Sequence, residues 1–439
     1  MRKKSYSLLI LGLFCAFFVI ITSCSKGNST VIDAFNNGTS HRNMIVVISD
    51  LHLGADISYA EINKNLKPLE HLLTQIRVST NVKELVIAGD MFDEWFVPGD
   101  VDTYKGKDQR DFMQRIAITN KGVIDAFNSI IKEKKIVVTY VPGNHDLTIT
   151  KDNVEFILPG INQARDNVLG LGTYMPEDFP ALAIEHGHRY NFFCAPDPIS
   201  NQDVAPGTIM PPGYFFTRIA TTHVVQKTES GKGVVIPITP YASGGESQVN
   251  LFKYWGAWKW SLELFTLNNK FDEKIILTNV DGFKGTYSVN DLLPYQSTPG
   301  GLIKVNLYNG IQDTWMERQA RNLVSVSIPA ARAIDNANNN LETDSHANLQ
   351  YFSNPKSHNR IVVFGHSHWA RIDAYDNFQG QKSIYANSGT WIDHNPRGKS
   401  TTFLVITPQG KKETSYTFVK LYNFENEIIT EMATDSLHL

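Results

Sequence analysis

The sequence predicts an α/β fold, in which a two-sheet β-sandwich is flanked by helices and carries an inserted cap region. Two observations predict it. Short apolar runs typical of buried strands alternate with segments of helical period over the first half of the chain. Near the C-terminus, further apolar runs follow one another without helices between them. A two-sheet sandwich flanked by helices fits this mixture.

The first strand is expected at Ile45-Val46-Val47-Ile48, an apolar run that ends just before Asp50. Helices are expected at 63–78 and at 108–133, where apolar residues recur at helical spacing. The remaining strands are expected at 85–88, 136–141, 182–184, 361–364, 383–386, 402–406 and 415–421.

Residues 195–300 interrupt this pattern and are expected to form an insertion or cap. They contain Pro and Gly clusters and a dense aromatic run, 252–260. One helical face of this stretch is apolar, and such a stripe packs in a core more often than it forms a platform for lipid or sugar. The stripe consists of Leu251, Trp255, Trp258, Leu262 and Phe265. We expect the insertion to set substrate choice. An Asn-rich stretch at 335–340 is expected to be a surface loop.

Residues 1–23 predict an export signal. Three basic residues precede a 14-residue apolar stretch, Leu8–Ile21, which is short for a membrane span and typical of a secretory signal. The stretch ends in Ile-Thr-Ser-Cys, which resembles a bacterial lipobox with Cys24 as the lipidated residue. An uncleaved N-terminal anchor is the alternative. Residues 24–43, rich in Ser, Asn and Gly, are expected to be a flexible tether. The rest of the chain is expected in the cell envelope, on the periplasmic or outer-membrane side.

Charge and cysteine content narrow the class of protein. Removing residues 1–23 takes away three of the 41 basic residues and none of the 44 acidic ones, so the formal charge becomes −6. This balance argues against a protein that binds nucleic acid polymers. Of the three cysteines, Cys15 lies in the signal and Cys24 at the lipid site, which leaves Cys194. We therefore expect no intrachain disulfide, and Cys194 is expected to be a small buried hydrophobe.

Five short motifs, each just past the end of an expected strand, contain the candidate metal ligands. Six of the 13 histidines of the chain lie in them. Because α/β sheets place ligand sites beyond the carboxyl ends of strands, we expect the motifs to meet in one site. The motifs are Asp50-Leu-His52, Gly89-Asp90-Met-Phe-Asp93, Gly143-Asn144-His145-Asp146, His186-Gly-His188 and Gly365-His366-Ser-His368.

The residue types in these motifs favour two metal ions. Asp50 and His52 lie two residues apart, so on an extended segment both side chains point the same way. Asp90 follows a glycine that permits a sharp turn, and its two carboxylate oxygens can bridge two cations. Nitrogen and oxygen ligands without thiolate suit zinc, manganese or iron. Two such ions about 3.5–4 Å apart are suited to phosphate chemistry. The candidate ligands are Asp50, His52, Asp90, Asn144, His186, His366 and His368.

Two residues beside these ligands are candidates for catalysis. His145 is expected to donate a proton or a hydrogen bond to the leaving oxygen. Asp93, three residues after Asp90, is expected to orient that imidazole. For His188 two roles stay open, since it either packs behind His186 or acts directly.

The order and strand-end placement of the motifs resemble the calcineurin-like metallophosphoesterase family over about residues 44–395, with the insertion unmatched. The resemblance implies the metallophosphoesterase fold for residues 44–439, with His145 as the catalytic histidine and Asp93 supporting it. It also implies one metal held by Asp50, His52, Asp90 and His368, and a second held by Asp90, Asn144, His186 and His366.

Two stretches, Ser49–Gly54 and Gly89–Trp95, look most like the branch of this family that contains UDP-2,3-diacylglucosamine pyrophosphatases. This chain has His188 where that branch usually has Asp.

The function expected from these features is hydrolysis of phosphate mono- or diesters outside the cytoplasm by a dinuclear metal site. The substrate is expected to be a phosphorylated small molecule, nucleotide or lipid, with membrane contact through the N-terminal lipid. One alternative is a nucleotide-sugar or nucleotide pyrophosphatase. A second is a metal-dependent lipoprotein that binds a phosphorylated glycan without cleaving it. Arg189, Arg218 and Lys253 either hold a phosphate or are solvated surface residues.

Overall fold

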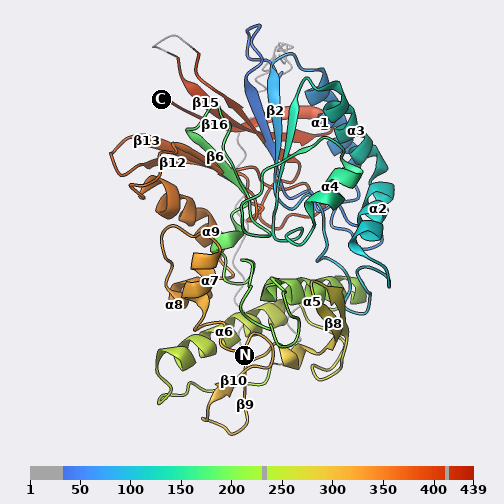
Figure 1. Ribbon diagram of the computed structural model, residues 1–439, viewed down its shortest axis with the longest axis vertical. Coiled ribbons are helices and arrows are strands. Elements are labelled where there is room, and N and C mark those ends of the chain that lie inside the picture. The colour runs from blue at the N-terminus through green and yellow to red at the C-terminus, as the bar shows by residue number, and fades with distance from the viewer. Residues whose placement is uncertain (1–32, 230–234, 411–414) are drawn as a thin grey trace, which may run out of the picture. The chain divides into compact units, whose positions relative to one another are not determined.

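Two β-sheets pack face to face at the centre of the fold (Figure 1). The computed structural model describes residues 33–229, 235–410 and 415–439. The larger sheet has seven strands in the order β16-β15-β14-β1-β2-β3-β4, with β1 to β4 parallel and β14 to β16 antiparallel. Its strands are β1 (Met44–Ile48), β2 (Val82–Ala88), β3 (Val137–Val141), β4 (Asn162–Gln163), β14 (Thr402–Thr407), β15 (Thr417–Glu425) and β16 (Ile428–Leu437).

The smaller sheet has five strands in the order β12-β13-β11-β6-β5. Its three central strands are parallel, and β12 and β5 run antiparallel at the edges. The strands are β5 (Thr173–Tyr174), β6 (Leu182–Glu185), β11 (Ile361–Phe364), β12 (Arg371–Asp376) and β13 (Lys382–Asn387). The predicted fold class, an α/β fold with a two-sheet sandwich and flanking helices, is therefore confirmed.

Alternation along the first strand builds two of the layers. Ile45 and Val47 point into the core between the two sheets, whereas Val46 and Ile48 point to the core under the helices. A strand that is buried on both faces needs an unbroken apolar run, which is what residues 45–48 supply. The helices that cover the outer face of the larger sheet (Figure 1) are α1 (Leu66–Val78), α2 (Gln109–Thr119), α3 (Lys121–Glu133) and α4 (Lys151–Ile157).

The single helix predicted at 108–133 is wrong, because two helices meet at Asn120. The Asn120 backbone has φ −110° and ψ 33°, which ends α2 and begins α3. Its side-chain amide donates to the carbonyl oxygens of Ile116 and Gly54, each at 2.9 Å. The second bond ties the break to the loop after β1. Both helices face the same core, so the apolar spacing runs across the break.

The chain between β6 and β11 forms the insertion. Its helices and small strands extend past residue 300, the expected end, because the later helices share one core with the earlier ones. The elements are η1 (His188–Tyr190), α5 (Pro212–Gln226), α6 (Gly245–Leu264), β7 (Ile276–Val280), β8 (Phe283–Tyr287), η2 (Val289–Asp291), β9 (Tyr295–Gln296), β10 (Ile303–Lys304), α7 (Trp315–Arg321), α8 (Ala330–Asp335), α9 (Asn340–Ala347) and the π-helical turn η3 (Asn348–Phe352).

The aromatic run of α6 packs in a core. Trp258 is fully buried and Trp255 nearly so, in a cluster that also includes Phe364 and Tyr385 from the smaller sheet. The apolar stripe therefore packs in the core, as one alternative predicted, and its buried tryptophans are not available as a surface platform for lipid or sugar.

Replacing Trp258 with alanine is expected to lower the free energy of unfolding by about 3–5 kcal/mol, because it leaves a large cavity in this core. Trp260 lies on the same helix with 47% of its surface exposed, so Trp260→Ala is the matched control and is expected to change stability by less than about 0.5 kcal/mol. Urea titration of both variants measures the difference. Equal losses would contradict the burial of Trp258.

The described part of the predicted tether packs against the sandwich. The Phe35 ring stacks on Phe403 with centroids 5.6 Å apart, and Ser79 donates to the Phe35 carbonyl oxygen. The expected tether (24–43) therefore differs from the structure over residues 33–43, because Phe35 and its neighbour Ala34 are buried. The predicted signal and Cys24 lie outside the described residues.

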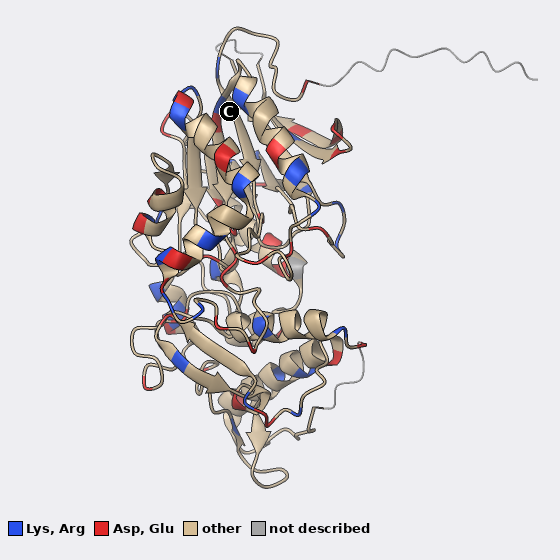
Figure 2. Ribbon diagram, turned by 90° about the vertical axis from the view of Figure 1, so that its right-hand side faces the viewer, with Lys and Arg blue, Asp and Glu red and all other residues tan. Residues whose placement is uncertain are grey.

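Charged residues of both signs alternate along the outer helices (Figure 2), as on ordinary solvated helix faces. Among the residues that the structure describes, no helix is both long and apolar enough to span a membrane.

Candidate metal centre

The loops after β1, β2, β3, β6 and β11 meet beyond the carboxyl ends of these strands, and they bring all seven predicted ligand side chains together. Among the described residues, three sets of His, Asp and Glu side chains could hold a metal ion, and within each set the candidate ligand atoms lie within 4.8 Å of one another. One set consists of His52, Glu61, Asp93 and His145, and the other two, the ligand groups, contain predicted ligands only. The first group is Asp50, His52 and His368, and the second is Asp90, His186 and His366.

The first group joins the first and fifth motifs. His368 Nε2 lies 3.2 Å from Asp50 Oδ1 and 3.2 Å from His52 Nε2. His52 Nε2 lies 4.0 Å from Asp50 Oδ1. One carboxylate oxygen and two imidazole nitrogens therefore point at one small volume.

The second group joins four motifs if Asn144 is included. His186 Nε2 lies 3.1 Å from Asp90 Oδ2 and 3.1 Å from Asn144 Oδ1. His366 Nδ1 lies 2.8 Å from the same Asn144 oxygen. The donor set is again mixed nitrogen and oxygen, without sulfur.

Asp90 lies between the two groups. Its Oδ2 is 3.1 Å from His186 Nε2 in the second group and 3.8 Å from His52 Nε2 in the first. Its other oxygen, Oδ1, accepts the backbone N–H of His145 at 2.8 Å, which fixes the carboxylate. A carboxylate in this place is suited to bridging two cations.

The backbone at this centre is strained. Left-handed φ angles of 48° to 67° occur at five of the seven candidate ligands, none of them glycine. Each such residue costs on the order of 1 kcal/mol or more and persists only where its surroundings hold it. The five are Asp50, His52, Asp90, His366 and His368. Gly143 is required for a different reason, since a Cβ there would lie 2.1 Å from Asp90 Oδ1.

The carboxylates of the centre have no Lys or Arg partner among the described residues. Asp50, Asp90 and Asp93 are buried, and within the described ranges they form ion pairs with histidines only, never with Lys or Arg. Buried carboxylates without compensating cations are costly, so this arrangement favours a bound cation.

The pKa shifts of His186 and His52 agree with this negative field, whereas burial and the charge of His186 lower the pKa of His366. Burial alone would lower the pKa of His186, but Asp90 and Asp50 outweigh it and raise the pKa to about 9. His52 behaves in the same way, since Glu61, Asp93 and Asp90 overcome the effect of burial and raise its pKa well above the usual range. A field that holds protons on buried imidazoles also attracts metal ions.

Hydrogen bonds fix which nitrogen of each imidazole faces the centre. His186 Nδ1 donates to the Ala88 carbonyl oxygen at 2.9 Å, which leaves Nε2 for Asp90 and Asn144. His52 Nδ1 lies 2.9 Å from Asp93 Oδ2, which leaves Nε2 for the first group. Metal-binding histidines are usually oriented by such a bond on the other ring nitrogen.

His145 lies beside the two groups and belongs to neither of them. Its Nδ1 lies 2.8 Å from Asp93 Oδ1, as the sequence predicted for this pair. The Trp95 ring packs against the imidazole, with centroids 4.9 Å apart. The His145 side chain is partly exposed. Burial would lower the pKa of His145, but Asp93 and Asp90 outweigh it and raise the pKa. When this imidazole is protonated, Asp93 holds Nδ1–H and Nε2–H is left to donate.

Comparison with known families agrees with this geometry. Residues 44–210 match the family model described as calcineurin-like phosphoesterase. This part of the chain is a calcineurin-like phosphoesterase domain. The matched residues include the first four motifs of the phosphoesterase domain, up to His186. No curated protein matches the chain.

The fifth motif lies outside the matched residues, and the structure connects it to the phosphoesterase domain. Strand β11 pairs in parallel with β6, so its carboxyl end lies next to that of the fourth motif's strand. The His366 backbone N–H donates to Asp50 at 3.1 Å. The candidate metal centre therefore also includes a segment that follows the insertion and lies outside the matched residues.

Two arginines that were candidates for holding a phosphate lie outside the ligand groups. Arg189 is buried and forms ion pairs with Asp166 and Glu185, 2.8 Å and 2.7 Å away. Arg218 is also buried and donates to backbone carbonyl oxygens of the loop after Asp93. The expectation that these arginines are solvated surface residues is therefore wrong. Neither arginine is a member of the ligand groups.

Lys253 pairs with Asp335 on the surface. His188 Nε2 lies 3.0 Å from the Gly170 carbonyl oxygen, and His188 is a member of neither ligand group. Burial and the charge of His186 lower the pKa of His188, so it is a neutral residue packed behind the centre. Cys194 is partly buried, and burial raises the pKa of its thiol to about 12.

Glu61 is a neighbour of the centre that no sequence motif indicated. Its Oε2 lies 3.2 Å from His52 Nδ1, close to Asp93 and His145. It lies late in the loop between β1 and α1, away from the end of the strand, so neither motif spacing nor strand-end placement marks it. Trp95, which packs on His145, ends the stretch Gly89–Trp95, but the sequence predicted no role for it in the site.

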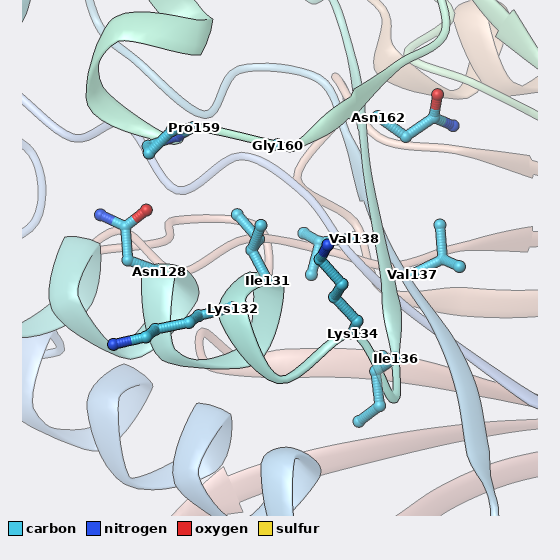
Figure 3. A pocket seen from close by; sticks show the side chains of 10 residues that line it. All are labelled: Asn128, Ile131, Lys132, Lys134, Ile136, Val137, Val138, Pro159, Gly160 and Asn162. Atoms are coloured by element: carbon cyan, nitrogen blue, oxygen red, sulfur yellow. The ribbon is translucent and has the colours of Figure 1, made fainter.

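A cavity of about 540 Å³ lies away from this centre (Figure 3). It is lined by residues at the end of α3 and at the start of β3, including Lys134 and Val137. The ligand groups follow the other end of β3, so this cavity is not part of the metal centre.

Proposed function

We propose that the protein is a metal-dependent phosphoesterase that hydrolyses phosphate mono- or diesters outside the cytoplasm. The observation that carries the proposal is the position of Asp90, whose Oδ2 faces two mixed nitrogen and oxygen ligand groups. The match to the calcineurin-like phosphoesterase family supports the reaction class.

The donor chemistry fits two divalent cations, which we propose to be manganese, iron or zinc. Asp50, His52, Asp90 and His368 would hold one ion, and Asp90, Asn144, His186 and His366 the other. When bound, such a pair supplies Lewis-acid stabilisation of a phosphoryl group and a more acidic water.

The chain's own residues supply the remaining steps. His145 donates its Nε2 proton to the leaving oxygen, since Nδ1 is held by Asp93. Asp93 also accepts from His52 through its second oxygen, so one carboxylate orients a ligand and the proton donor together. The carboxylate stays ionised, because His145 and His52 outweigh burial and lower the pKa of Asp93.

A substrate panel tests this function. The purified protein is stripped with chelator and assayed with Mn²⁺, Fe²⁺ or Zn²⁺ on p-nitrophenyl phosphate, bis(p-nitrophenyl) phosphate and a nucleotide sugar. We expect turnover of a monoester or a diester that depends on added metal. Turnover of the nucleotide sugar alone would identify a pyrophosphatase, the activity of the branch that residues 49–54 and 89–95 resemble. Binding of phosphorylated glycan without any turnover would leave the lipoprotein alternative.

We also propose that Cys24 is lipidated and anchors the protein in the cell envelope, because it follows an apolar stretch and Ile-Thr-Ser. In Cys24→Ser, incorporation of labelled fatty acid is expected to disappear, and the protein is expected to be soluble or unprocessed. Cys194→Ser is the matched control, since it removes the other thiol that remains after residues 1–23 are cleaved. Unchanged labelling of the Cys24→Ser protein would refute the anchor.

A further inference from the structure

A carboxylate from the insertion reaches the loop that carries two of the candidate ligands. Asp344 lies in α9 and is fully buried. Its Oδ2 accepts a hydrogen bond from Ser367 Oγ at 3.0 Å. Ser367 is the residue between His366 and His368. A buried side chain of the insertion therefore bonds to the residue that is adjacent in sequence to both histidines.

The same carboxylate is held by the neighbouring strand. Its Oδ1 accepts from the Tyr385 hydroxyl at 2.5 Å and from Asn387 Nδ2 at 3.3 Å. The Asn387 amide also donates to the Gly365 carbonyl oxygen at 2.7 Å. Asp344 and Asn387 thus each form a hydrogen bond to the loop of the fifth motif, at Ser367 and at Gly365.

This loop needs support from its surroundings. His366 has φ 67° and His368 has φ 59°, conformations that non-glycine residues adopt at a cost and keep only when neighbours impose them. The hydrogen bonds of Asp344 and Asn387 act on the residues before and between the two histidines. They are therefore placed to impose the strained conformation.

The charge of Asp344 is partly balanced. Arg371 Nε lies 3.5 Å from Asp344 Oδ2. Tyr385 lies under the same guanidinium, 5.5 Å from its ring centroid. A carboxylate buried with three hydrogen-bond donors and a nearby guanidinium is a built feature of the fold, and a segment that only covered the site would not need it.

We propose that Asp344 is a positioning residue of the metal centre, through which the insertion holds the loop of His366 and His368 in its ligand-bearing conformation. The proposal rests on the proposed function, because it concerns the same metal centre. It assigns the insertion a role distinct from the substrate choice expected from the sequence, since the insertion supplies part of the support for the ligands.

The test measures metal affinity together with activity. Asp344→Asn and Ser367→Ala are each expected to weaken Mn²⁺ binding about 10–100-fold, the usual effect of removing a partner that orients metal ligands. Binding is measured by competition with a fluorescent chelator, at a temperature where circular dichroism shows each variant folded. Asp197→Asn is the matched control, since Asp197 is a fully buried carboxylate of the insertion that bonds to Ile199 and Ser200 instead.

The double variant Asp344→Asn/Ser367→Ala separates positioning from general stability. We expect it to bind Mn²⁺ about as weakly as the weaker single variant, because each change removes the same hydrogen bond from Ser367 Oγ to Asp344 Oδ2. If Asp344→Asn does not fold, Ser367→Ala alone decides.

Wild-type affinity in folded Asp344→Asn and Ser367→Ala, or an equal loss in Asp197→Asn, would overturn the proposal. A wild-type protein that binds no Mn²⁺ would instead overturn the proposed function.

Discussion

Replacing His145 with alanine is expected to lower kcat by about 10²–10⁴-fold, while the protein keeps its metal. The imidazole lies beside both ligand groups and belongs to neither, so its removal leaves every proposed ligand in place. The expected decrease in kcat reflects the lost proton or hydrogen bond that Nε2 donates to the leaving oxygen. Metal content by elemental analysis and kcat on the same sample measure the two effects together.

The leaving group provides an internal control for this variant. Nitrophenolate needs little protonation, so the loss in His145→Ala is expected to be smaller on nitrophenyl esters than on alkyl esters. His71→Ala is a matched surface control, since that imidazole is partly exposed on α1 and is expected to leave kcat unchanged. Wild-type rates of His145→Ala on alkyl esters would show that another residue donates the proton.

Replacing Asp90 with asparagine is expected to lower metal content and activity together. The substitution removes a negative charge from an oxygen that lies 3.1 Å from His186 Nε2 and 3.8 Å from His52 Nε2, between the two groups. An amide keeps the shape but is a poorer bridge between two cations. We expect fewer than two ions per chain and activity reduced at least as far as in His145→Ala.

Asp178→Asn is the control for this change, since Asp178 is a well-exposed carboxylate that pairs with Lys83 on the surface. It is expected to keep both metal and activity. Full metal content in Asp90→Asn, with activity lost, would mean that Asp90 acts on the substrate and does not bridge.

The strands and their motifs could be predicted because both signals are local. An apolar run such as 45–48 reports burial on two faces, and the polar residue after it reports the sheet edge where ligands gather. The break at Asn120 could not be predicted, because its cause is a hydrogen bond to Gly54, far away in the sequence.

The candidate ligands also follow apolar strands and could be predicted in the same way. The residues that contact and orient these ligands carry no such signal. Glu61, Trp95 and Asp344 reach the centre from a loop, a turn and an inserted helix, none marked by spacing. Left-handed backbone at residues such as His366 is also invisible in the sequence, since non-glycine residues adopt it only where the fold imposes it. The buried arginines were misjudged for the same reason, because Arg218 is satisfied by carbonyl oxygens of a distant loop.

The most direct test of the metal centre is the number of ions bound per chain. The protein is stripped with chelator, reconstituted with Mn²⁺, freed of excess metal and subjected to elemental analysis alongside an activity assay. The two ligand groups around Asp90 predict two ions per chain, with activity rising as the second ion binds. Full activity at a stoichiometry near zero would contradict the account.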